Sequence, residues 1–145
     1  MIKIEESSIF ASTNNYVCED VNVTDLDRNK HFVLSMHTGF KQFDFVPISE
    51  FESKNYKGKY VKLVFENQIG KRYEMVCDIY QKIYTKVRGY VQAPRLNAGD
   101  VMLDYENRNC KLISSEEFDG EFNVFNIKAG YNLNYICNGI LVRSN

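Results

Sequence analysis

The sequence has no tryptophan and only two prolines, and it has no apolar run long enough to cross a membrane as a helix. Met1–Glu6 does not show the basic head and apolar stretch of a secretory signal peptide, so we expect a cytoplasmic protein. Internal repeats and linker-like tracts are missing too, so residues 1–145 are expected to form one domain. The hydrophobic content of 44% and charged content of 26% exclude a disordered chain and a coiled coil.

The cysteines give no sign of a metal site or a disulfide framework. A structural zinc site gathers its ligands in local pairs such as C-x2-C, and Cys18, Cys77, Cys110 and Cys137 contain no such pair. Without a signal peptide we expect reduced thiols, with Cys77 and Cys137 acting as small core hydrophobes. No metal or cofactor is predicted.

Charge is strongly segregated along the chain although the net charge is only −1. Residues 1–53 carry −5, residues 54–95 carry +7 and residues 96–145 carry −3. Two interpretations are open: the segments neutralise each other across the fold, or the middle segment presents a positive surface to an anionic partner.

The dominant pattern is an alternation of apolar and polar residues with period two, which is typical of half-buried strands. Asn138-Gly139 predicts a type I′ hairpin turn, because both residues tolerate positive φ. Eight or more strands with little helix predict a mainly β fold, an antiparallel β-sandwich or β-barrel. The predicted strands cover residues 31–36, 40–46, 59–66, 73–79, 101–105, 110–113, 121–128, 131–137 and 140–143.

One or two short helices complete the prediction. Pro47 is expected to end a strand, and the capping-box spacing of Ser49 and Glu52 predicts a helical turn or two after it. Residues 75–88 also fit a helical stripe, but their β-branched and aromatic residues favour strand. Turns are predicted at residues 37–39 and 119–120.

A pattern of tyrosines and cations marks residues 80–90. If this segment is extended, one face alternates rings and cations, the arrangement that binds single-stranded nucleic acid by base stacking and phosphate neutralisation. The alternative is an ordinary exposed strand face, whose tyrosines and lysines pair across strands. The candidate binding residues are Tyr80, Lys82, Tyr84, Lys86, Arg88 and Tyr90, extended by Lys62, Lys71 and Arg72.

Catalytic candidates are weak by comparison. His31 and His37 stand about 20 Å apart on one strand, too far to share an ion. Asp100 and Asp104 share a strand parity with Glu106, but about 13 Å separates the first two, and a polar outward face accounts for all three. No phosphate-binding glycine loop or nucleophile elbow is present, so the sequence does not demand catalysis.

These observations favour a non-enzymatic β module that acts through protein–protein contacts, as an assembly component or an inhibitor, or by self-association. The use of Asn, Lys, Ile, Tyr and Phe is typical of AT-rich coding sequences such as those of phages and mobile elements, so a virion-associated structural protein fits as well. The alternative function is single-strand nucleic-acid binding through the 80–90 face.

Overall fold

A computed structural model describes residues 1–13, 17–37 and 39–145, and within these ranges every regular element is a β-strand apart from two single-turn 3-10 helices. The elements are β1 (Ile2–Lys3), β2 (Ser8–Thr13), β3 (Val17–Asn22), η1 (Val23–Asp25), β4 (His31–His37), β5 (Gln42–Asn67), β6 (Arg72–Asp78), β7 (Lys82–Thr85), β8 (Gly89–Gln92), η2 (Ala93–Arg95), β9 (Val101–Leu103), β10 (Asn109–Ala129), β11 (Asn134–Cys137) and β12 (Ile140–Arg143).

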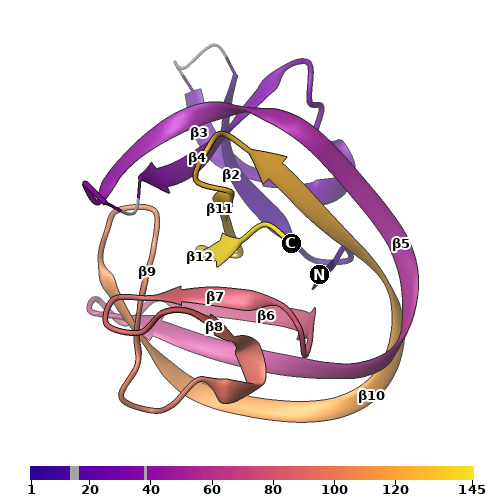
Figure 1. Cartoon of the computed structure of the whole chain (residues 1–145), viewed down its shortest axis with the longest axis vertical. Helices are drawn as coiled ribbons and strands as arrows, with labels where there is room; N and C mark the ends of the chain where they lie inside the picture. Colours follow the sequence, from indigo (N-terminus) through magenta and orange to yellow (C-terminus); the bar gives the residue numbers. More distant parts are fainter. Residues whose placement is uncertain (14–16, 38) are drawn as a thin grey trace.

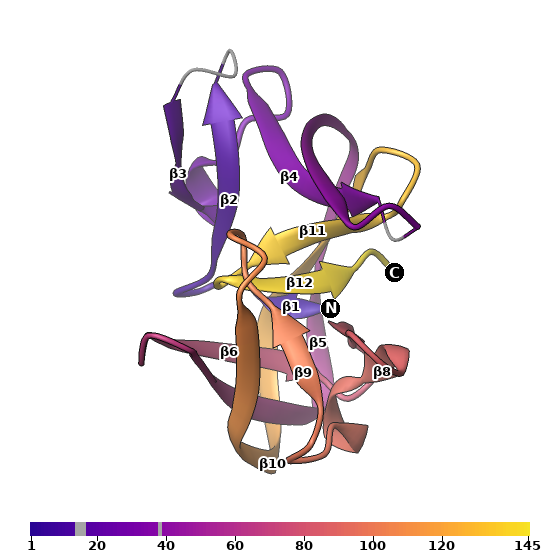
Figure 2. The same ribbon diagram turned by 90° about the vertical axis from the view of Figure 1, so that its left-hand side faces the viewer.

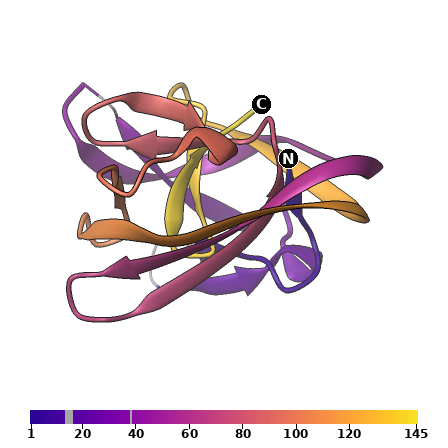
Figure 3. The same ribbon diagram turned by 90° about the horizontal axis from the view of Figure 1, so that it is seen from below.

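Two very long strands, β5 and β10, organise the molecule. They pair antiparallel from Cys110↔Asn67 to Ala129↔Ile48 and curve together around the shorter strands (Figure 1). The view from below shows the same curvature (Figure 3). Gly58 lies opposite Gly120 in this ladder, and a Cβ on Gly58 would approach the Tyr56 hydroxyl to 2.6 Å. The paired glycines therefore let aromatic rings lie over the ribbon where it bends.

All the strand pairs are antiparallel. Strand β5 is long enough to pair with β4 at one end and with β6 at the other. Its first residues, 42–47, pair with β4, and its last residues, 60–66, pair with β6. In the second view, β2, β3 and β4 form the upper part of the molecule, β6, β9 and β10 form the lower part, and β11 and β12 lie between them (Figure 2). The main core contains Ile2, Phe65, Phe125 and Tyr135, all fully buried.

The predicted antiparallel β class is confirmed, as are the strand assignment of residues 75–88 and the hairpin at Asn138-Gly139. Residues 75–88 form the end of β6, a tight turn and β7. Asn138 has φ 48° and Gly139 has φ 81°, the positive values that a type I′ turn requires. Cys137 and Ile140 pair directly across this turn.

The predicted short helices are wrong, because the described residues contain no α-helix and residues 49–52 belong to β5. Pro47 does not end the strand: it lies opposite Phe32 at the end of the β4 ladder, where β5 passes on to β10 and the missing N–H costs little. The predicted turn at Asp119-Gly120 is also wrong, since both residues pair within β10. The predicted turn at 37–39 includes Thr38, which lies outside the described residues.

Candidate functional site

The two ends of the chain lie close together at the centre of the molecule (Figure 1). At the amino end, β1 fits between two strands, because Ile2 pairs with Cys77 of β6 and with Phe125 of β10. The Met1 ammonium binds the Asp78 carboxylate at 2.9 Å, and both side chains of this pair are nearly buried, with 11% and 8% exposure. The Asp78 N–H donates in turn to the Met1 carbonyl at 2.9 Å. The amino end is therefore fixed by backbone and charge together.

The turn after β6 connects this amino end to the carboxyl end. Asp78 Oδ1 accepts hydrogen bonds from the backbone N–H groups of Tyr80 and Gln81, both at 3.0 Å. Gln81 is fully buried, and its Nε2 donates to the carbonyls of Arg143 at 2.8 Å and Lys82 at 3.1 Å. One carboxylate thus binds the Met1 ammonium and shapes the turn whose glutamine holds the last strand.

The last two residues are held beyond the end of β12. The Ser144 N–H donates to the Leu133 carbonyl at 2.7 Å, and its hydroxyl donates to the Ile127 carbonyl. The buried Asn126 binds Asn145 twice: its Oδ1 accepts from the Asn145 N–H at 2.9 Å, and its Nδ2 donates to the Asn145 carbonyl at 3.2 Å. The terminal site is defined by these anchors and the residues they hold: Met1, Asp78, Gln81, Asn126, Ser144 and Asn145.

Asn126 also links the terminal site to the amino end. Ile2 lies opposite Phe125, so Met1 and Asn126 occupy the next level of the same pair of strands. The register thus places the backbone of Met1 opposite that of Asn126, whose carboxamide binds Asn145. The Asn126 Nδ2 donor is buried and polarises the oxygen to which it donates, the effect by which preorganised donors assist attack on a carbonyl.

Thiols lie near the terminal site, but burial suppresses their reactivity. Cys77 pairs with Val61 of β5 in the main core, and burial raises the pKa of its thiol to about 12. Burial likewise raises the pKa of Cys137 well above its ordinary value. A thiolate is the nucleophilic form, so neither residue supplies one at neutral pH.

The structure separates the residues predicted to form a nucleic-acid face, because residues 80–90 form a turn and the β7–β8 hairpin instead of one extended strand. Tyr84 is buried, its hydroxyl bonded to the Lys41 ammonium, and Tyr90 is half-buried. Arg88 is bound to Asp100, with Nε–Oδ1 at 2.9 Å and Nη2–Oδ2 at 2.6 Å. Tyr80, Lys82 and Lys86 are exposed, but the alternating face does not exist.

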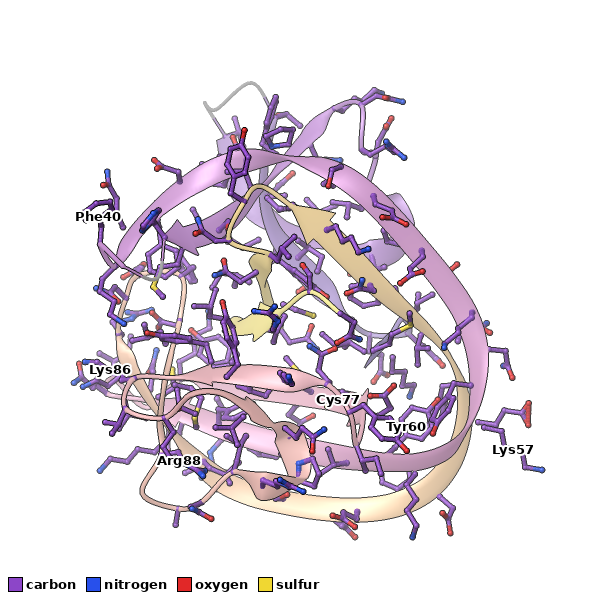
Figure 4. The ribbon with its side chains drawn as sticks, viewed as in Figure 1. Phe40, Lys57, Tyr60, Cys77, Lys86 and Arg88 are labelled. Atoms are coloured by element: carbon purple, nitrogen blue, oxygen red, sulfur yellow. The ribbon has the colours of Figure 1, made fainter. Side chains whose placement is uncertain are left out.

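The basic residues predicted to extend that face do not gather either. Lys62 lies on β5 opposite Val76, whereas Lys71 and Arg72 lie at the β5–β6 turn, where Arg72 pairs with Glu66 at 3.8 Å. Lys57 lies on the opposite side of the molecule from Lys86 and Arg88 (Figure 4). The cationic middle segment is thus distributed over the fold.

The acidic and histidine candidates have structural surroundings. Asp104 is fully buried and binds Arg108 at 2.9 Å, and the Arg88 guanidinium lowers the pKa of Asp100. The Nδ1 atoms of His31 and His37 accept hydrogen bonds from nearby backbone N–H groups. Within residues 1–13, 17–37 and 39–145, no group of three His, Cys, Asp or Glu side chains is placed to hold a metal ion.

Comparison with solved structures identifies the architecture. A bacterial intein-like domain from Clostridium thermocellum superposes with a TM-score of 0.80 over 99% of this chain and 98% of its own, at 14% sequence identity. The chain has the intein fold. The DnaB intein of Synechocystis sp. matches at TM-score 0.72 and 16% identity, over 97% of this chain and 99% of its own. The gp41-1 intein matches at 0.69 and 17%, over 99% and 98%. No protein-family model and no curated protein sequence matches the chain.

The intein fold overturns the functional prediction. Inteins are protein-splicing domains, so both the non-enzymatic binding module and the single-strand nucleic-acid binder are wrong. The roles of inhibitor, phage protein and structural protein find no support, while the all-β class stands. No helix in the described part of the chain is long and apolar enough to cross a membrane. Self-association stays a prediction.

Sequence reasoning missed the terminal site entirely. Its residues are far apart in the chain, and none of them belongs to a local motif that signals chemistry. Asn126 and Asn145 look like ordinary polar residues until β10 and the end of β12 are brought side by side. The sequence offered no local signal for it, because β1 pairs with β6 and β10 while the C-terminal hairpin pairs with β2 and β7.

Proposed function

We propose that the chain is a self-processing domain of the intein type that acts on the peptide bond following Asn145. The observation that carries the proposal is the two-point hold of Asn126 on the Asn145 backbone, at 2.9 Å and 3.2 Å. The Asn145 oxygen stands in for the peptide carbonyl of a chain that continues past it, and in such a chain the two bonds fix the residue and polarise the carbonyl together. Fixing a reacting group relative to its target is worth orders of magnitude in rate.

The bonds that form and break belong to Asn145 and to the peptide bond that follows it. The side-chain Nδ2 attacks the carbonyl carbon of the same residue, forming an N–C bond and a five-membered succinimide ring. The C–N bond to the following residue breaks, and the Nδ2 proton passes to the amine that leaves. No oxidant, reductant or metal takes part, and the Asn126 Nδ2 stabilises the negative charge that develops on the carbonyl oxygen.

The amino end supports cleavage better than full splicing. Splicing needs a reaction at both ends, and Met1 has a thioether with no proton to lose and no stable acyl product. Cys77, the thiol paired in register with Ile2, is buried with its pKa raised to about 12. We therefore propose C-terminal cleavage without ligation.

A fusion tests this proposal. A stable reporter protein is joined directly after Asn145, and the purified fusion is followed by gel electrophoresis at neutral pH. We expect release of the reporter, with loss of cleavage in Asn145→Ala. The matched control is Asn97→Ala, which removes an exposed asparagine from the loop after η2.

The two variants separate the proposal from its alternatives. Cleavage that persists in Asn145→Ala would mean a contaminating protease or another reacting residue. A fusion that stays intact for days while folded would show that the chain keeps the intein fold without the reaction.

A further inference from the structure

Gln81 stands out among the polar residues that the proposed reaction does not use. It is fully buried, and it lies in the turn between β6 and β7. Its Nε2 bridges the carbonyls of Lys82 and Arg143. Its Oε1 is buried without a hydrogen-bond partner in the described part of the chain.

The Gln81 side chain binds the carbonyl of Arg143, the residue at which β12 ends. The ladder between β7 and β12 has Val142↔Ile83 as its register pair, and β12 ends at Arg143. From there the chain continues through Ser144 to Asn145 without strand pairing. Gln81 thus adds a side-chain hydrogen bond at Arg143, which also pairs with Asn134 of β11, directly before the two residues whose geometry the reaction requires.

A purely stabilising role accounts poorly for this residue. A buried acceptor without a partner lowers stability, and a methionine of similar length would fill the same space without that cost. What a methionine cannot supply is the N–H donor on the Arg143 carbonyl. The donor fixes the backbone two residues before Asn145, and displacements of about 1 Å at a reacting group can cost about 100-fold in rate.

We infer that Gln81 is a positioning residue for the reaction at Asn145, acting through the carbonyl of Arg143. The inference rests on the proposed function. In this role the turn after β6, which carries Gln81, fixes the backbone conformation of the residues that follow β12. Asp78 shares this task indirectly, because its Oδ1 shapes the turn that carries Gln81.

Two substitutions in the reporter fusion test the inference. Gln81→Met removes the donor and keeps the volume, and we expect cleavage to slow by about 10- to 100-fold. Gln81→Glu keeps the shape, and burial beside two carbonyls raises the pKa of the new carboxyl, so this variant loses its donor only as the pH rises through that pKa. Protonated glutamic acid can donate through its O–H, so this variant should recover speed as the pH falls.

The pH profile distinguishes positioning from stability. The Asp78 carboxylate accepts from the Gln81 N–H and binds the Met1 ammonium, while Arg143 binds Gln81 through its carbonyl and places its guanidinium over the Tyr90 ring. All three charged groups are present in every variant. Dividing each variant's rate by the wild-type rate at the same pH therefore removes their contribution. The Gln81→Glu ratio should rise towards acid pH, while the Gln81→Met ratio stays low and flat.

Thr85→Val is the matched control. It removes two hydrogen bonds of a buried side chain at the far end of β7, from Oγ1 to the Gly89 carbonyl at 2.8 Å and from the Arg88 N–H to Oγ1 at 3.1 Å. We expect it to lower thermal stability without changing the cleavage rate. If Gln81→Met loses stability, its slow cleavage has two explanations. The rise of the Gln81→Glu cleavage rate at low pH still tests positioning, because it compares one variant with itself.

The outcomes are separable. A wild-type fusion that does not cleave overturns the proposed function and this inference together. A wild-type fusion that cleaves, with Gln81→Met equally fast or with Gln81→Glu slow at every pH, overturns the inference alone.

Discussion

Asn126 and Asn145 form a reciprocal pair across the fold: the Asn126 carboxamide accepts from the Asn145 N–H and donates to the Asn145 carbonyl. Asn126 is 1% exposed on β10, so its rotamer is set by the core and not by solvent. Asn145 is exposed, so the buried partner does the holding. This asymmetry is what a reacting residue at a chain end requires: it is fixed on its backbone while its side chain is accessible.

Asn126→Asp should slow cleavage of the reporter fusion at pH 8 by about 100- to 1,000-fold. The carboxylate still accepts from the Asn145 N–H but cannot donate to its carbonyl, and losing one such donor typically costs that much. Glu52 lies 3.4 Å from the Asn126 amide, so the substitution is also made in a Glu52→Gln background to remove the like charge. An unchanged rate in that background would show that the Asn126 donor does not assist the reaction.

Acetylating the α-amino group of Met1 should destabilise the domain. It removes the charge that pairs with Asp78 at 2.9 Å and leaves a largely buried carboxylate supported by backbone N–H groups alone. We expect a loss of about 1–3 kcal/mol in urea unfolding. The same modification in Asp78→Asn should cost less, and equal costs in both backgrounds would contradict the ion pair.

Gly139→Ala should destabilise the fold by several kcal/mol, because a Cβ there would overlap the Tyr73 ring and φ is 81°. Gly70→Ala is the matched control: φ is 84°, but the nearest atom, Glu66 Oε1, is 3.8 Å away. It should cost only about 1–2 kcal/mol, the penalty for a left-handed backbone. Chemical denaturation measures both, and similar losses would mean that the Tyr73 contact contributes nothing.

Stability should fall as the pH rises from 9 to 12. Burial raises the pKa of Cys77 from 9.0 to about 12, so in this interval the unfolded chain loses a proton that the folded chain keeps. The stabilisation is complete below pH 9 and is lost through pH 12, on the order of 4 kcal/mol for this thiol. Cys110 and Tyr73, with pKa values also raised to about 12, act in the same direction.

Cys77→Ala should flatten this alkaline slope, and Cys18→Ser, at an exposed thiol, should leave it unchanged. The slope is read from urea midpoints between pH 8 and pH 11. Identical slopes in the wild type and Cys77→Ala would contradict burial of that thiol.

Much of the fold could be read from local pattern. Period-two alternation predicted the strand class, and Asn138-Gly139 predicted its hairpin because the tolerance of Asn and Gly for positive φ is a local property that needs no distant contact. The two long strands could not be predicted as such. Asp119-Gly120 has the composition of a turn. In the structure Gly120 lies opposite Gly58, where the continuous β5–β10 ladder bends.

The terminal site could not be read from the sequence because it is built by long-range closure. Asp78 is the last residue of β6 and Asn126 lies within β10, and nothing in their neighbours indicates that they contact the two chain ends. The predicted face of alternating tyrosines and cations in residues 80–90 was wrong for a different reason. Its alternation is real in sequence, but the β7–β8 turn reverses the chain between Thr85 and Gly89 and buries Tyr84.

The most direct test of the account is the intact mass of the domain released from a fusion that continues past Asn145. Attack by the Asn145 carboxamide predicts a fragment one water lighter than the chain ending in free asparagine, converting to the heavier form as the ring hydrolyses. A released fragment that carries the full mass of free asparagine from the earliest time point would mean simple hydrolysis and would contradict the role given to Asn145.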